Sequence, residues 1–116
     1  MATIKSYTDI EQSKKLAEIL PLESADMQWF LEEDYGIVQI KEELQDWGGD
    51  CTVPCWSLAA LLDVVRKTIG YTIYGIKNVY ISCELGDFKR IETDLYDNEV
   101  DACVAMIEKL YKLNLL

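Results

Sequence analysis

The spacing of apolar residues along this chain switches between a helical repeat and strict alternation, which limits the folds it can adopt. Helical spacing covers three segments, residues 9–20, 54–69 and 97–111. Alternation covers two segments, residues 27–41 and 71–93, each interrupted by turn residues. This order predicts an α+β fold of two layers, with three helices packed on one face of an antiparallel sheet built from two hairpins, in the order αββαβββα.

Residues near the helix ends predict where each helix starts. Thr8 and Glu11 have the spacing of a capping box for the first helix. Pro54 suits the first turn of the second helix, which we expect to be the most buried of the three. Asp97 or Asn98 is suited to cap the third helix. Its core-facing stripe is expected to contain Val100, Cys103, Val104, Ile107, Leu110 and Tyr111.

The size and composition of the chain are those of one globular domain, residues 1–116, with residues 1–5 expected to be poorly ordered. The longest uncharged apolar stretch, Trp56 to Leu62, is far shorter than the roughly 20 residues that a membrane span requires. The amino terminus lacks the apolar run of a signal peptide. We therefore expect a soluble cytoplasmic protein.

Negative charge is concentrated in one segment, between Pro21 and Asp50. This segment has nine carboxylates against one lysine, and so holds eight of the ten net negative charges. A net charge of −10 repels phosphate backbones and anionic membrane surfaces, which are bound through clustered Lys and Arg. Direct binding to nucleic acid or to a membrane is therefore not expected.

Large aromatic residues lie within the same acidic segment, and this mixture favours a recognition surface over a solvated tail. Trp56 is expected in the core, whereas Trp47, in a glycine-rich loop, is expected to be partly exposed. Phe30 shares its strand face with Gln28 and Glu32, which places it outside the core. The predicted partner-binding residues are Phe30, Glu32, Glu33, Asp34, Tyr35, Asp46 and Trp47.

These residues favour a non-enzymatic module that binds a basic protein partner, with a homodimer as the nearest variant. A second hypothesis is a decoy that imitates nucleic-acid phosphates, which requires carboxylates in a regular row. A third is a small-molecule binder or hydrolase that uses clustered carboxylates. It requires a concavity with at least two acids of raised pKa.

Other catalytic and metal chemistry finds little support in the sequence. The chain has no histidine, which excludes Ser-His and Cys-His catalysis. Cys51 and Cys55 have the wrong spacing for a redox motif, and Cys83 and Cys103 are expected on separate core faces, so no metal or cofactor site is predicted. All four cysteines are expected to be reduced thiols. Ser57 is expected to satisfy an amide in the first turn of a helix.

Three segments resemble an uncharacterised group of short bacterial proteins that are often linked to mobile elements. They are Glu11 to Pro21, Pro54 to Leu62, and Asn98 with the following run Val100 to Ile107. The resemblance covers all three predicted helices, and the group has no assigned activity. It implies a small cytoplasmic accessory protein of a bacterium or its phage.

Overall fold

The protein contains three helices and six strands, seen in a computed structural model that describes residues 5–31, 36–40, 51–68, 71–74, 79–84 and 90–116. The helices are α1 (Ile10–Ala17), α2 (Leu58–Thr68) and α3 (Glu99–Lys112), and a 3₁₀ turn covers Leu22–Ser24. The strands are β1 (Met27–Leu31), β2 (Gly36–Ile40), β3 (Thr52–Cys55), β4 (Tyr71–Tyr74), β5 (Tyr80–Glu84) and β6 (Arg90–Glu92).

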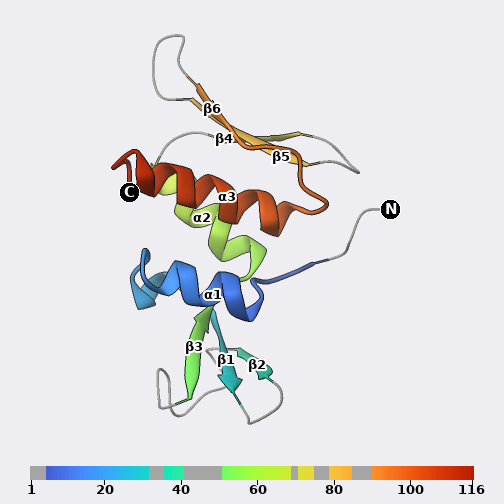
Figure 1. Ribbon diagram of the computed structural model, residues 1–116, viewed down its shortest axis with the longest axis vertical. Coiled ribbons are helices and arrows are strands. Elements are labelled where there is room, and N and C mark those ends of the chain that lie inside the picture. Colours follow the sequence, from blue (N-terminus) through green and yellow to red (C-terminus); the bar gives the residue numbers. More distant parts are fainter. Residues whose placement is uncertain (1–4, 32–35, 41–50, 69–70, 75–78, 85–89) are drawn as a thin grey trace.

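The strands form two antiparallel sheets of three strands each, ordered β2-β1-β3 and β4-β5-β6. Figure 1 shows the two sheets at opposite ends of the molecule, with the three helices between them. The α+β class, the three helices and both predicted hairpins are confirmed. The three strands of the second group, β4 to β6, were expected, whereas the hairpin β1-β2 gains an unpredicted third strand, β3. The structure differs from the expected single sheet because the two groups of strands pack on different helices, α1 and α3.

Strand β3 occupies residues that the sequence assigns to a loop and a first helical turn. Pro54 lies opposite Gln28 of β1 in the register. Among the described strands β3 pairs with β1 alone, and proline is tolerated in an edge strand because its missing N–H need not face a neighbour. Helix α2 therefore begins at Leu58. There the hydroxyl of Ser57 accepts the amide of Ala60 at 3.2 Å, as the sequence predicts for this serine.

Helix α1 begins with Asp9 as its N-cap, in place of the expected Thr8. The Asp9 carboxylate accepts the amide of Gln12 at 2.8 Å, and the Gln12 side chain accepts the amide of Asp9 at 3.1 Å. The predicted capping box of Thr8 and Glu11 is therefore wrong by one residue. Thr8 is fully buried, and its hydroxyl accepts the amide of Trp56 instead.

Helix α3 is capped by Asn98, whose side-chain oxygen accepts the amide of Asp101 at 2.8 Å. The prediction that α2 is the most buried helix is wrong for the described residues, because α3 lies between α2 and β5 and is covered from both sides. Tyr111 was expected in the core stripe, but 52% of its surface is exposed. The buried residues of α3 are Val100, Ala102, Cys103, Val104, Met106, Ile107 and Leu110.

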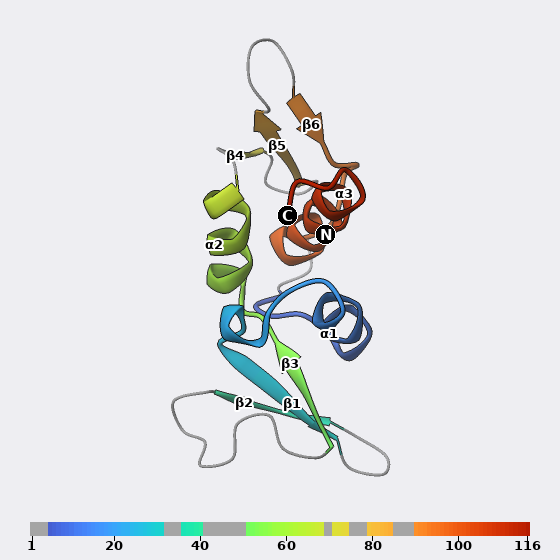
Figure 2. The same cartoon turned by 90° about the vertical axis from the view of Figure 1, so that its left-hand side faces the viewer.

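One hydrophobic cluster joins the three helices to β5, with Leu16, Leu61, Ile81 and Ile107 among its fully buried members. Trp56 is also fully buried in this cluster, as predicted. Figure 2 shows that α2 and α3 lie side by side above α1, and the two sheets extend the molecule to 47 × 33 × 22 Å. None of the described helices is long and apolar enough to span a membrane.

Candidate functional site

The structure describes one of the seven predicted partner-binding residues, Phe30 on β1. The remaining predicted partner-binding residues lie outside the described part of the chain: Glu32, Glu33, Asp34, Tyr35, Asp46 and Trp47. The candidate site is therefore built from the sheet β2-β1-β3, in which Phe30 is embedded. This sheet has two chemically different faces.

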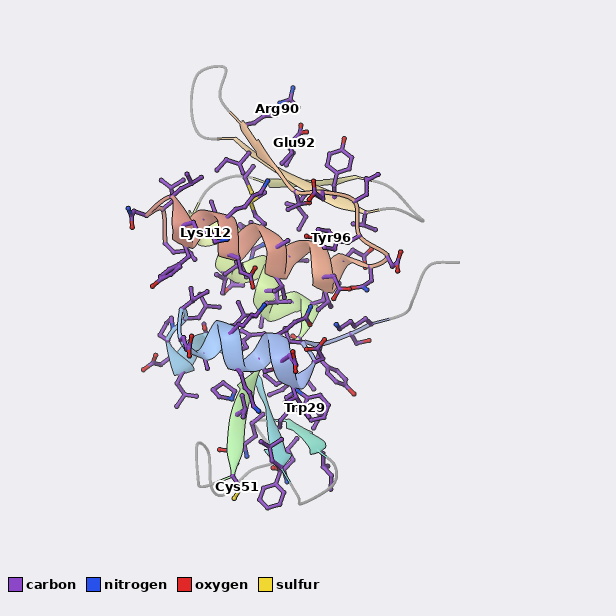
Figure 3. The ribbon with its side chains drawn as sticks, viewed as in Figure 1. Trp29, Cys51, Arg90, Glu92, Tyr96 and Lys112 are labelled. Atoms are coloured by element: carbon purple, nitrogen blue, oxygen red, sulfur yellow. The ribbon has the colours of Figure 1, made fainter. Side chains whose placement is uncertain are left out.

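The inner face of the sheet is packed against the N-terminal segment and α1. Trp29 donates its indole N–H to the carbonyl of Thr8 at 3.0 Å, and its ring meets Tyr7 edge to face with ring centroids 5.8 Å apart. A Cβ added to Gly36 would lie 2.9 Å from Trp29 and 3.0 Å from Ile10, so this close approach requires glycine. In Figure 3, Trp29 lies next to α1, whereas Cys51 lies at the far end of β3.

The outer face carries Phe30, because side chains alternate along a strand and its neighbour Trp29 faces inward. In the register Phe30 lies opposite Ile37 of β2 on one side and Thr52 of β3 on the other. Phe30 is half-buried and is not part of the core cluster, and Ile37 is 46% exposed. Phe30 and Ile37 therefore form an apolar pair on the face opposite α1.

The row next to this pair is polar. Gln28 and Gln39 face each other in the register and are joined by a hydrogen bond of 3.1 Å, and Gln28 is buried although it lies on the same face as Phe30. Ile37 is not among the predicted partner-binding residues, because the alternation of Val38 and Ile40 assigns the core face to those two residues. The signal available in the sequence was that Ile37 is apolar although it occupies an outward-facing position of the same strand.

A groove of about 360 Å³ lies between α1 and α3. Its lining consists of Asp9, Glu11, Gln12, Lys15, Tyr96, Asp101, Val104, Ala105 and Glu108. Lys5 joins the two helices at this place, with its ammonium donating to Asp9 at 3.1 Å and to Asp101 at 2.8 Å. Its third hydrogen bond goes to the side-chain oxygen of Gln12 at 2.8 Å.

These contacts shift the pKa values of Lys5 and Asp101. Burial raises the pKa of Asp101, but hydrogen bonds from Lys5, Gln12 and Asn98 outweigh it and hold the pKa below its ordinary value. Burial lowers the pKa of Lys5, but its bonds to Asp101 and Asp9 raise it overall. A general acid requires a raised pKa, so Asp101 gives no support to the hydrolase hypothesis.

Burial keeps the inner cysteines in the thiol form. Burial raises the pKa of the Cys55 thiol. It raises the pKa of Cys83 to about 11 and the pKa of Cys103 to about 12. The expectation that Cys83 and Cys103 lie on separate core faces is wrong. Strand β5 packs on α3, and Cys83 helps to raise the pKa of Cys103. Within the described ranges, no three side chains of His, Cys, Asp or Glu gather as metal ligands.

Comparisons with protein families, with curated proteins and with solved structures give no match for this chain. The resemblance to short bacterial proteins of mobile elements stays a prediction. The geometry of the sheet β2-β1-β3 and the charge of the chain are therefore the guides to its function.

Proposed function

We propose that the protein is a non-enzymatic binding protein that holds a basic protein partner on the outer face of the sheet β2-β1-β3. The observation that carries this proposal is the apolar pair of Phe30 and Ile37 on that face. We propose the cytoplasm as its location, supported by the free, buried thiols of Cys55, Cys83 and Cys103, which suit a reducing compartment.

The pair is unusual for the face on which it lies. An antiparallel sheet that packs one face on a helix normally presents polar side chains on the other. Here the inner face already holds Trp29 against Thr8 and Tyr7, so the outer pair adds nothing to that packing. Aromatic and aliphatic side chains in such a position serve well as anchors for a partner.

Charge indicates the chemistry of the partner. The sequence segments 32–35 and 41–50, which adjoin β1 and β2 along the chain, contain seven carboxylates and one lysine. Opposite charges accelerate encounter and exclude partners of like charge. A partner that offers Lys or Arg around an apolar side chain matches both features.

Selection from a random peptide library on the immobilised full-length protein tests this proposal. We expect enriched peptides to combine Lys or Arg with a large apolar residue. Phe30→Ala and Ile37→Ala should each weaken the binding of such a peptide about tenfold, which is the effect of losing a contact worth about 1.4 kcal/mol. The matched control is Leu95→Ala, since Leu95 is 62% exposed and lies on the segment between β6 and α3.

Two results would contradict the proposal. One is the enrichment of peptides without positive charge, and the other is unchanged binding by both sheet variants. The rate of association should also fall severalfold between low and moderate salt, because screening shortens the range of charge steering. If sedimentation velocity shows a dimer that Ile37→Ala dissociates into monomers, the partner is a second copy of this chain.

The decoy hypothesis depends on the seven carboxylates between residues 32 and 50, all of which lie outside the described residues. Competition with duplex DNA for a repressor or a nuclease tests it. The absence of any competition would remove this alternative.

A further inference from the structure

A largely apolar hollow of about 340 Å³ lies where the segment that follows α1 meets α2 and the chain after α3. Its lining consists of Ile19, Leu20, Pro21, Glu23, Ser24, Val64 and Leu116. Small-molecule sites typically occupy about 300–1,000 Å³ and combine apolar walls with a few polar groups. The size and the lining of this hollow fit the lower end of that class.

The polar wall of the hollow is tied to the core. The hydroxyl of Ser24 donates to the carbonyl of Pro21 at 2.6 Å and accepts the indole N–H of Trp56 at 2.9 Å. Trp56 is fully buried, so this wall has a fixed position. The hydroxyl of Ser24 already has a donor and an acceptor partner, and it needs none from a ligand.

The opposite wall comes from the chain after α3. Asn114 has a φ of 59°, in the left-handed region, and the amide of Leu115 bonds back to the carbonyl of Leu110 at 2.8 Å. This reversal brings Leu116 to the hollow, where it remains 45% exposed. Leu22, on the 3₁₀ turn that forms part of the rim, is 40% exposed. The hollow therefore opens to solvent between apolar side chains.

Among the lining residues, Glu23 has a charged side chain. Its side chain is exposed, and none of the described cations lies within ion-pair distance of it. A carboxylate beside apolar walls, on a chain with a net charge of −10, attracts cations and repels anions.

We propose that this hollow binds a small amphiphilic cation, a ligand with an aliphatic body and an amine head. The aliphatic body packs against Ile19, Leu20 and Val64, and the amine lies beside the Glu23 carboxylate. This site is separate from the sheet β2-β1-β3, and the test of this proposal does not depend on the proposed protein partner.

Three probes of equal chain length and different charge test the proposal: octylamine, octanol and octanoate, each kept below its micelle concentration. Methyl NMR shifts of Ile19, Val64 and Leu116 in the full-length protein report where each probe binds. We expect saturable shifts at these methyl groups, with octylamine bound about fivefold more tightly than octanol, the effect of one exposed ion pair. Octanoate should bind most weakly.

Glu23→Gln should reduce the affinity for octylamine to that for octanol and leave octanol binding unchanged. The matched control Glu99→Gln, at an exposed carboxylate outside the lining, should preserve the preference for the amine. Ile19→Phe should fill the hollow and weaken all three probes.

The proposal is overturned if the three probes bind equally well or do not saturate. It is also overturned if Glu23→Gln keeps the preference for the amine. Shifts of the same methyl groups with protein concentration alone would show that a second copy covers the hollow, and that result too would overturn it.

Discussion

Removing the hydroxyl of Thr8 should destabilise the junction at which the segment before α1 pairs with the segment between β3 and α2. This hydroxyl accepts the amide of Trp56 at 3.1 Å and lies 2.8 Å from the hydroxyl of Ser13. The amide of Thr8 in turn donates to the carbonyl of Trp56 at 3.0 Å. Thr8, Ser13 and Trp56 are all fully buried, so no water replaces a lost partner without rearrangement.

The variant Thr8→Val keeps the shape of the side chain and removes its oxygen. The amide of Trp56 would then be buried without an acceptor, at a cost of about 1–3 kcal/mol, and Ser13 would lose a hydrogen bond worth about 1 kcal/mol. We expect the free energy of unfolding to fall by about 2–4 kcal/mol, a large part of the roughly 5–15 kcal/mol of a typical domain.

Urea denaturation followed by circular dichroism measures this change as a lower midpoint at an unchanged slope. The matched control is Thr8→Ser, which keeps the oxygen and loses one methyl group, at a cost of about 1 kcal/mol. In the double variant with Ser13→Ala the losses should add to less than their sum, because the bond between Thr8 and Ser13 is removed only once.

If Thr8→Val changes the free energy of unfolding by less than about 0.5 kcal/mol, the size of an ordinary surface substitution, the hydroxyl does not stabilise the junction. The same conclusion follows if Thr8→Ser is as damaging as Thr8→Val. In that case the methyl group, and not the hydroxyl, would stabilise the junction.

Three further predictions concern single sites. Because folding lowers the pKa of Asp101, its contribution to stability is present above its ordinary pKa and is lost as the pH falls through the folded value. Asp101→Asn should therefore destabilise the protein by about 1 kcal/mol at pH 7 in urea titrations, and the effect should shrink as the pH falls below the ordinary carboxyl pKa. Gly36→Ala should lower the free energy of unfolding by about 1–3 kcal/mol in thermal denaturation, since the new Cβ meets Trp29 at 2.9 Å, and an unchanged midpoint would contradict the packing. A thiol reagent at neutral pH should modify the exposed Cys51 in the native protein and reach Cys55, Cys83 and Cys103 only after unfolding; rapid modification of all four thiols would contradict their burial.

Elements with strong local signals could be predicted from the sequence. The cap at Asn98 and the apolar stripe from Val100 to Leu110 depend on neighbours within one helix. The two hairpins also follow from alternation within short segments. Tyr111 was misplaced at the edge of that stripe, where a small rotation of the helix decides between core and solvent.

Features that depend on distant partners could not be predicted in this way. Pro54 suggests a helical first turn until β1 is beside it, and then it belongs to an edge strand. Thr8 has the pattern of a cap, but Trp56, 48 residues away, engages its hydroxyl. For the candidate site, the strand face of Phe30 followed from alternation, whereas its pairing with Ile37 required the register between β1 and β2.

The sequence by itself therefore determined the helices, the hairpins and the concentration of negative charge, because these depend on residues close together in the chain. The tertiary structure alone decided that the hairpins form two separate sheets with the helices between them. It also decided which apolar side chains remain uncovered, at Ile37 and around the hollow beside Glu23. The physical reason is that burial and strand pairing are set by contacts between segments far apart in sequence, and local periodicity does not specify which segments meet.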